Sequence, residues 1–230
     1  MDIGAGFAGP AVDDGRLFLF HRIKDKEVLD CMDANTGKII WRRSTVADYE
    51  DQFGFDEGPR AVPTVSAERV FTLGANGLIE CADVRSGKTL WIVDAKIKFR
   101  ADQGFFGFAC SPMVNGANLL INISGNNAGI IALDINSGKL RWSVAKEKAS
   151  YASPILAVIN DKPQAIFFTR DGVVSTNPMS GKINFSHAWR PAINASVNAC
   201  TPVAVGNLIF VSTSYGKGAT VLAVDGAPGM

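Results

Sequence analysis

The sequence lacks an excess of charge of either sign, and it lacks long apolar runs. Lysine and arginine number 23 against 22 aspartate and glutamate residues, so the net charge is +1. This balance argues against nucleic acid or an anionic membrane as the partner. No apolar run reaches the roughly 18 residues needed to cross a bilayer, so no transmembrane segment is expected. No basic-then-apolar signal peptide opens the chain either.

Helical periodicity is also missing, and no stretch free of glycine and proline has the pattern of a long amphipathic helix. Hydrophobic residues make up 47% and charged residues 20% of the 230 positions, which excludes a disordered chain. A chain of this length can bury about 70% of its extended surface, so its core needs no disulfide or metal staple. The composition therefore predicts a globular, β-rich protein.

The sequence does contain a repeated motif. The run Asp33–Trp41 returns as Asp83–Trp91 and Asp134–Trp142, and more loosely as Asn177–Phe185. An aromatic residue follows the glycine of each copy by four positions, in the pairs Gly37 and Trp41, Gly87 and Trp91, Gly138 and Trp142, and Gly181 and Phe185. The Asp can accept hydrogen bonds from turn amides, and the Gly supplies the positive φ of a tight hairpin. We expect Asp33, Asp83, Asp134, these glycines and these aromatics to be structural.

A proline and an apolar run precede each motif. The prolines are Pro10, Pro63, Pro112, Pro154 and Pro202. Each unit therefore predicts four short strands: one after the proline, the apolar run, one ending at the Asp or Asn, and one carrying the aromatic. Units of this size predict an all-β fold, a β-propeller of four-stranded antiparallel blades. A set of β-sandwiches is the alternative, but each sandwich needs roughly 100 residues.

The predicted blades form a single domain over residues 1–230. Their approximate bounds are 6–48, 58–98, 107–148, 150–190 and, incomplete, 196–225. At these residues the chain resembles the PQQ-like repeat β-propellers, the quinoprotein alcohol dehydrogenase-like family, which includes outer-membrane-assembly lipoproteins. The hallmark of that family is the repeated Ala-x-Asp-x-x-Thr-Gly-Lys-x-x-Trp, the tryptophan-docking motif.

The resemblance implies a parent of seven or eight blades. The four and a half blades are therefore expected to form a partial, open propeller, a fragment of a longer protein, and the absent signal peptide fits the same truncation. A five-blade ring closed by Met1–Gly6 as its last strand is the alternative. The resemblance also implies an extracytoplasmic location, periplasmic or secreted.

Cysteine and histidine are too few to define a site. Cys31 and Cys81 share one repeat position, and Cys110 and Cys200 share another, without adjacency or CxxC spacing. Equivalent positions in different blades lie too far apart for a disulfide bond, so buried strand positions are expected for all four. Quinoprotein dehydrogenases that the chain resembles place a disulfide between adjacent cysteines against the quinone, and no such pair exists here. The histidines, His21 and His187, are expected at the surface or at strand ends.

Loops that enter the first strand of a blade, or leave its second, gather on one face of a propeller. Their aromatics, amides and arginines suit a pocket for a small molecule or a peptide. The predicted binding residues on this loop face are Glu57, Arg60, Asn76, Phe106, Asn126, Tyr151, Arg170, Asn198 and Tyr215. The other interpretation is that they are ordinary turn residues. Asp56 and Glu57 offer calcium-type oxygens, but no further ligands are evident, so no metal site is predicted.

The leading hypothesis is a non-catalytic, extracytoplasmic binding or scaffold module with no cofactor and no catalytic residue. The first alternative is a quinoprotein dehydrogenase, in which PQQ with calcium on the axis would oxidise an alcohol or a sugar. The second alternative is a hydrolase or lyase, for which Asp56, Glu57 and Asp171 are the candidate acids.

Overall fold

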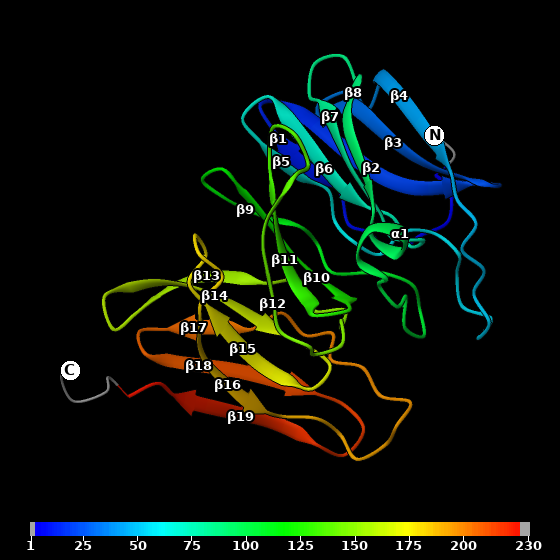
Figure 1. Ribbon diagram of the computed structural model, residues 1–230. Helices are drawn as coiled ribbons and strands as arrows, with labels where there is room; N and C mark the ends of the chain where they lie inside the picture. The colour runs from blue at the N-terminus through cyan, green and yellow to red at the C-terminus, as the bar shows by residue number, and fades with distance from the viewer. Residues whose placement is uncertain (1–2, 226–230) are drawn as a thin grey trace.

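The computed structural model describes residues 3–225, and they form five antiparallel sheets that follow one another along the chain (Figure 1). The first sheet contains β1 (Ala11–Asp13), β2 (Arg16–Ile23), β3 (Lys26–Asp33) and β4 (Ile39–Val46). The second contains β5 (Thr64–Ser66), β6 (Arg69–Leu73), β7 (Leu78–Asp83) and β8 (Thr89–Asp94). The third contains β9 (Met113–Asn115), β10 (Asn118–Gly125), β11 (Ala128–Asp134) and β12 (Leu140–Val144).

The fourth sheet contains β13 (Ile155–Ile159), β14 (Lys162–Phe168), β15 (Gly172–Thr176) and β16 (Ile183–Ala188). The fifth has three strands, β17 (Val203–Val205), β18 (Leu208–Thr213) and β19 (Gly218–Ala223). The single helix of residues 3–225, α1 (Ala95–Phe99), joins the second sheet to the third. In every sheet the strands lie in chain order, so each sheet is a meander of hydrogen-bonded neighbours. The sequence prediction of four-stranded blades, with about half of a fifth, is confirmed.

The repeated motif forms the turn between the third and fourth strands of a blade. The Oδ1 atom of Asp83 accepts hydrogen bonds from the Ser86 amide at 2.8 Å and from the Arg85 amide at 3.2 Å. Gly87 then adopts a φ of +69°, which a side chain would disfavour. Hydrogen bonds from Ser86 lower the pKa of Asp83, because they favour its ionised form.

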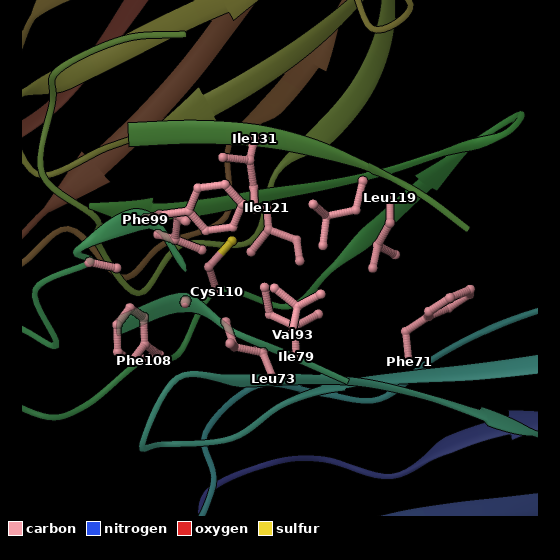
Figure 2. Close-up of a cluster of buried hydrophobic side chains, with 14 of the residues drawn as sticks. Phe71, Leu73, Ile79, Val93, Phe99, Phe108, Cys110, Leu119, Ile121 and Ile131 are labelled. Atoms are coloured by element: carbon pink, nitrogen blue, oxygen red, sulfur yellow. The ribbon is translucent and has the colours of Figure 1, made fainter. Parts of the chain in front are cut away.

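Four hydrophobic clusters lie between successive sheets, one at each seam. The largest joins the second and third sheets, where Phe71 and Val93 face Leu119 and Ile131 (Figure 2). Consecutive residues of a strand pack on opposite faces of the sheet: Val70 packs toward the first sheet and Phe71 toward the third. Both faces of an inner sheet are therefore buried. This explains why the apolar run of the second strand is continuous and does not alternate with polar residues.

Each motif tryptophan reaches across a seam to the motif glycine of the next sheet. A Cβ atom on Gly87 would lie 2.6 Å from the ring of Trp41, and one on Gly138 would lie 2.8 Å from the ring of Trp91. The same close approach joins Trp142 to Gly181 at 2.6 Å. The indole N–H of Trp91 also donates to the Ile135 carbonyl at 3.0 Å. The motif thus ties neighbouring blades together.

Phenylalanine substitutions should separate packing from hydrogen bonding at these seams. Trp91→Phe should lower the free energy of unfolding by about 1–3 kcal/mol more than the loss of buried ring area alone would, because it leaves the Ile135 carbonyl unpaired. Trp142 is the matched control: its buried indole nitrogen has no hydrogen-bond partner among residues 3–225. We expect Trp142→Phe to cost less than Trp91→Phe in urea denaturation. Equal losses would contradict the role given to the Ile135 bond.

The N-terminal segment lies along the first sheet. Ala5 forms an antiparallel bridge with Arg22 of β2, and the Gly4 amide donates to Nδ1 of His21 at 2.8 Å. This placement contradicts the alternative of a five-blade ring closed by Met1–Gly6, for the part of that segment that the structure describes. Met1 and Asp2 lie outside the described residues. No helix among residues 3–225 is long and apolar enough to cross a membrane.

Two expectations about single residues are wrong. His21 is only 2% exposed, because its ring lies on the sheet and its Nε2 is 3.1 Å from the Asp30 carboxylate. Cys200 is exposed in the loop before β17, whereas Cys31, Cys81 and Cys110 are buried as free thiols. Burial raises the pKa of the Cys81 thiol to about 12, so it is not a reactive thiolate at neutral pH.

Candidate functional site at the mouth

One cavity of about 420 Å³ collects side chains from loops that adjoin all five sheets. We call it the mouth cavity, and it is lined by Phe7, Phe55, Arg60, Phe106, Ala109, Tyr151, Val197, Ala199 and Tyr215. Eight of these residues belong to segments that lead into the first strand of a sheet. The ninth, Tyr215, lies in the turn between β18 and β19. The segments that enter the first strands therefore converge, whereas only Tyr215 of the predicted leaving segments reaches the same cavity.

The convergence follows from the way the first strands meet. β1 lies beside β5, and β5 lies beside β9. Cross-links between sheets hold the entering segments in place: the Val62 amide donates to the Ser111 hydroxyl at 2.9 Å, and the Thr64 hydroxyl donates to the Pro112 carbonyl at 2.5 Å. A residue just upstream of each first strand is thus brought to the same place.

A single repeat position supplies five of the lining residues. Counting back three residues from each repeated proline gives Phe7, Arg60, Ala109, Tyr151 and Ala199, one from each sheet. The residue type changes from sheet to sheet, although the position does not. Sequence reasoning found Arg60 and Tyr151 but missed the other three. Their shared spacing from the proline was the signal that could have found them.

Aromatic rings form one wall of the mouth cavity. The ring of Phe106 lies 5.2 Å from that of Phe53, 5.5 Å from that of Phe55 and 5.7 Å from that of Tyr151, measured between centroids. The Phe106 amide donates to the Tyr151 hydroxyl oxygen at 2.7 Å. Burial raises the pKa of Tyr151, so the phenol stays protonated at neutral pH. The hydroxyl is a neutral group fixed in a mostly apolar wall.

Two arginines lie at this wall. The guanidinium carbon of Arg60 is 5.5 Å from the ring centroid of Phe7 and 5.3 Å from that of Tyr49. It also donates to the carbonyls of Asp56 at 2.7 Å and Gly58 at 3.1 Å. Arg170 lies 5.0 Å above the ring of Phe105 and helps line a small hollow beside Tyr151. Cation–π contacts and carbonyls hold both guanidinium groups.

The nine predicted binding residues take different positions. Arg60, Phe106, Tyr151 and Tyr215 line the mouth cavity, and Arg170 lies next to it. Glu57 is exposed and pairs with Arg22 at 3.3 Å. Asn126 is exposed in the turn between β10 and β11, outside the lining.

The structure corrects the positions of Asn76 and Asn198, which are buried and used inside the fold. The Asn198 side-chain amide donates to the Thr169 carbonyl at 2.8 Å, and its backbone amide donates to the Ser150 hydroxyl at 2.8 Å. The Asn76 side chain accepts the Leu78 amide at 3.3 Å. Both asparagines brace loops from within, because buried backbone groups there need partners.

The first sheet carries two buried carboxylates, neither of which lines the mouth cavity. Burial opposes ionisation of Asp30, but hydrogen bonds from Arg42 and His21 outweigh it and hold its pKa at about 2. Burial raises the pKa of Glu27 to about 7, although the Ala75 amide donates to it at 2.7 Å. Sequence reasoning missed both, because strand register alone shows which polar side chains face inward.

Meander sheets stacked face to face, with a tryptophan packed on the next turn glycine at the first three seams, define a PQQ-like repeat β-propeller. A family model agrees over nearly the whole length: the chain belongs to the family described as outer membrane protein assembly factor BamB, whose model matches residues 2–98 and 24–229. Among curated proteins, the serine/threonine-protein kinase AfsK of Streptomyces griseus is 26% identical over 160 residues. That match covers 70% of this chain but only 18% of the kinase.

Solved structures show the same fold. A europium-containing methanol dehydrogenase aligns with a TM-score of 0.64 and 15% identity over 93% of this chain and 56% of its own. The quinohemoprotein alcohol dehydrogenase from Comamonas testosteroni aligns with a TM-score of 0.62 and 14% identity, over 92% of this chain and 40% of its own. The chain thus spans only part of each relative, and the likeness concerns the fold.

Proposed function

We propose that this chain is a non-catalytic binding or scaffold module that holds a ligand or partner over the mouth cavity. The observation that carries the proposal is the shared repeat position three residues before each proline, which brings five side chains of four types to one cavity. Its volume of about 420 Å³ lies in the range of ligand sites. Varied side chains on a repeated framework are typical of a binding surface.

A quinone with calcium fits the mouth cavity poorly. Calcium takes six to eight oxygen ligands, mostly from carboxylates and carbonyls. The lining offers only two side-chain oxygens, the phenols of Tyr151 and Tyr215, and no carboxylate. Asp56 already accepts the Gly58 amide at 2.6 Å, and Glu57 pairs with Arg22. Within residues 3–225 no group of three or more metal-type side chains occurs. We therefore derive no reaction step through PQQ.

The three acids proposed for the hydrolase or lyase alternative do not line the mouth cavity either. Asp171 accepts the Lys148 amide at 3.1 Å and lies 3.4 Å from Arg190, whereas Asp56 and Glu57 belong to the loop before β5. An extracytoplasmic location remains part of the proposal. It is supported by the family description, which concerns the assembly of outer membrane proteins.

A thermal-shift panel tests this function. The full chain would be heated with short peptides, with oligosaccharides, and with PQQ plus calcium. A ligand at 100 times its Kd should add about 2.7 kcal/mol of stability. We expect that shift to disappear in the triple variant Arg60→Gln, Tyr151→Phe, Arg170→Gln and to persist in Arg85→Gln, an exposed arginine in a motif turn.

If a ligand still raised the melting temperature of the triple variant, and its circular dichroism were unchanged, the mouth cavity would not be the binding site. Saturable binding of PQQ, followed by dye-linked alcohol oxidation, would establish the dehydrogenase instead.

A further inference from the structure

The two arginines at the mouth have donors to spare. Arg60 donates to two carbonyls, which leaves three of its five N–H groups without an acceptor among residues 3–225. The Nε of Arg170 is buried and likewise has no partner within that range. No carboxylate among residues 3–225 lies within ion-pair distance of either guanidinium, although six other arginines form such pairs. The mouth therefore holds two guanidinium groups that have no ion-pair partner among residues 3–225.

Among residues 3–225, the acidic side chains of the same region form no ion pair with Arg60 or Arg170, because they bind other groups. Asp51 accepts the Phe55 amide, Asp56 accepts the Gly58 amide, and Glu57 pairs with Arg22. Tyr151 lines the mouth cavity together with Arg60 and lines the small hollow together with Arg170, so both guanidinium groups lie near one phenol. An anion near that hydroxyl would be close to both arginines.

Apolar surface extends beyond the mouth cavity itself. Phe7, Phe53, Phe55 and Tyr215 remain between 41% and 67% exposed around it. A small molecule inside the cavity would leave Phe53 in water, since that residue is not part of the lining. Rings and arginines grouped around a hollow are the composition of protein-binding hot spots. The exposed rim thus favours a partner wider than the cavity.

We propose that the mouth binds an acidic peptide segment of a partner protein, with an aromatic side chain in the mouth cavity and a neighbouring carboxylate on Arg60 and Arg170. The proposal rests on the proposed function and adds the chemistry of the partner. The arginine forks recognise the carboxylate, because guanidinium and carboxylate groups match in a bidentate geometry. The rings of Phe55 and Phe106 cover the aromatic side chain.

Fluorescence anisotropy of the full chain with three labelled pentapeptides tests this. The first peptide alternates glutamate with phenylalanine, the second replaces its glutamates with lysine, and the third replaces its phenylalanines with alanine. We expect the first to bind at least about tenfold more tightly than the others, which corresponds to one charge-assisted hydrogen bond. Its affinity should fall between about 0.05 M and about 0.3 M salt, because salt screens the arginines.

Variants locate the contact. Arg60→Gln and Arg170→Gln should each weaken the first peptide about tenfold, whereas Arg85→Gln should leave it unchanged. Arg60 also bonds to the loop carbonyls, so Arg60→Lys, which keeps the charge but not the fork, serves as a second variant with intermediate affinity expected. Circular dichroism would verify that each variant folds.

The outcomes separate this inference from the function beneath it. Equal binding of the acidic and basic peptides overturns the charge assignment. Failure of the acidic peptide to bind overturns the inference while the thermal-shift panel still finds a ligand sensitive to the mouth variants. Failure of both experiments overturns the proposed function as well.

Discussion

Replacing Trp91 by alanine should lower the free energy of unfolding by about 3–5 kcal/mol. The side chain is only 9% exposed and belongs to the largest cluster, between the second and third sheets. Its ring centroid lies 5.9 Å from that of Phe71, and the ring also packs on Gly138 of the next turn. Truncation would remove this contact and the Ile135 hydrogen bond together, and would open a void at the seam.

Urea denaturation of the full chain measures the effect, provided that the slope with denaturant stays constant. Leu90→Ala is the matched control, because Leu90 is the neighbouring residue on β8 but faces solvent. We expect the control to change stability by less than about 1 kcal/mol. A loss that small at Trp91 would contradict its position in the seam.

Replacing Glu27 by glutamine should change the free energy of unfolding more favourably at pH 8 than at pH 5. Burial raises the pKa of Glu27 to about 7 in the fold, against 4.5 for a free side chain. The stabilising contribution of the protonated form is therefore complete below about pH 4.5 and is lost as the pH rises through about 7. The loss is on the order of 3 kcal/mol, because one pKa unit corresponds to about 1.4 kcal/mol.

Groups around Glu27 act in both directions. The Ala75 hydrogen bond and Arg22 favour its ionised form, whereas Glu80 and Asp48 oppose it. Glutamine keeps an oxygen for the Ala75 amide but never carries the buried charge. Urea midpoints at pH 5 and pH 8 measure the difference, with Glu68→Gln as the control, since Glu68 is exposed and paired with Arg85. The same change in midpoint for both variants would show that Glu27 does not ionise inside the fold.

The sequence was sufficient to predict the fold because the same turn motif occurs in four copies. Asp83, Gly87 and Trp91 predicted a turn and a buried ring, and the structure shows both. The apolar runs predicted strands, and each sheet has its second strand there. These features depend on neighbours along the chain, and the period then shows where each one recurs.

The candidate site was only partly predictable, because it depends on which distant segments meet. Arg60 and Tyr151 were identified from loop composition, but Phe7 was missed because its only signal is a spacing of three residues from the repeated proline, which becomes evident when all five units are compared. Asn198 was assigned to the surface because its loop is polar, whereas the fold uses its amide to satisfy the Thr169 carbonyl. His21 was misplaced for the same reason, since its partner Asp30 lies on the neighbouring strand.

The contact between tryptophan and glycine at each of the first three seams has a direction. Every sheet from the first to the third gives its ring to the next sheet, and every sheet from the second to the fourth receives one at its turn glycine. A duplicated unit would therefore carry a tryptophan ring on one face and a turn glycine on the other. These are the two groups needed to pack against a copy on either side. Evolution could lengthen or shorten such a protein by whole units, and a laboratory recombining units cut at the same repeat position could do the same.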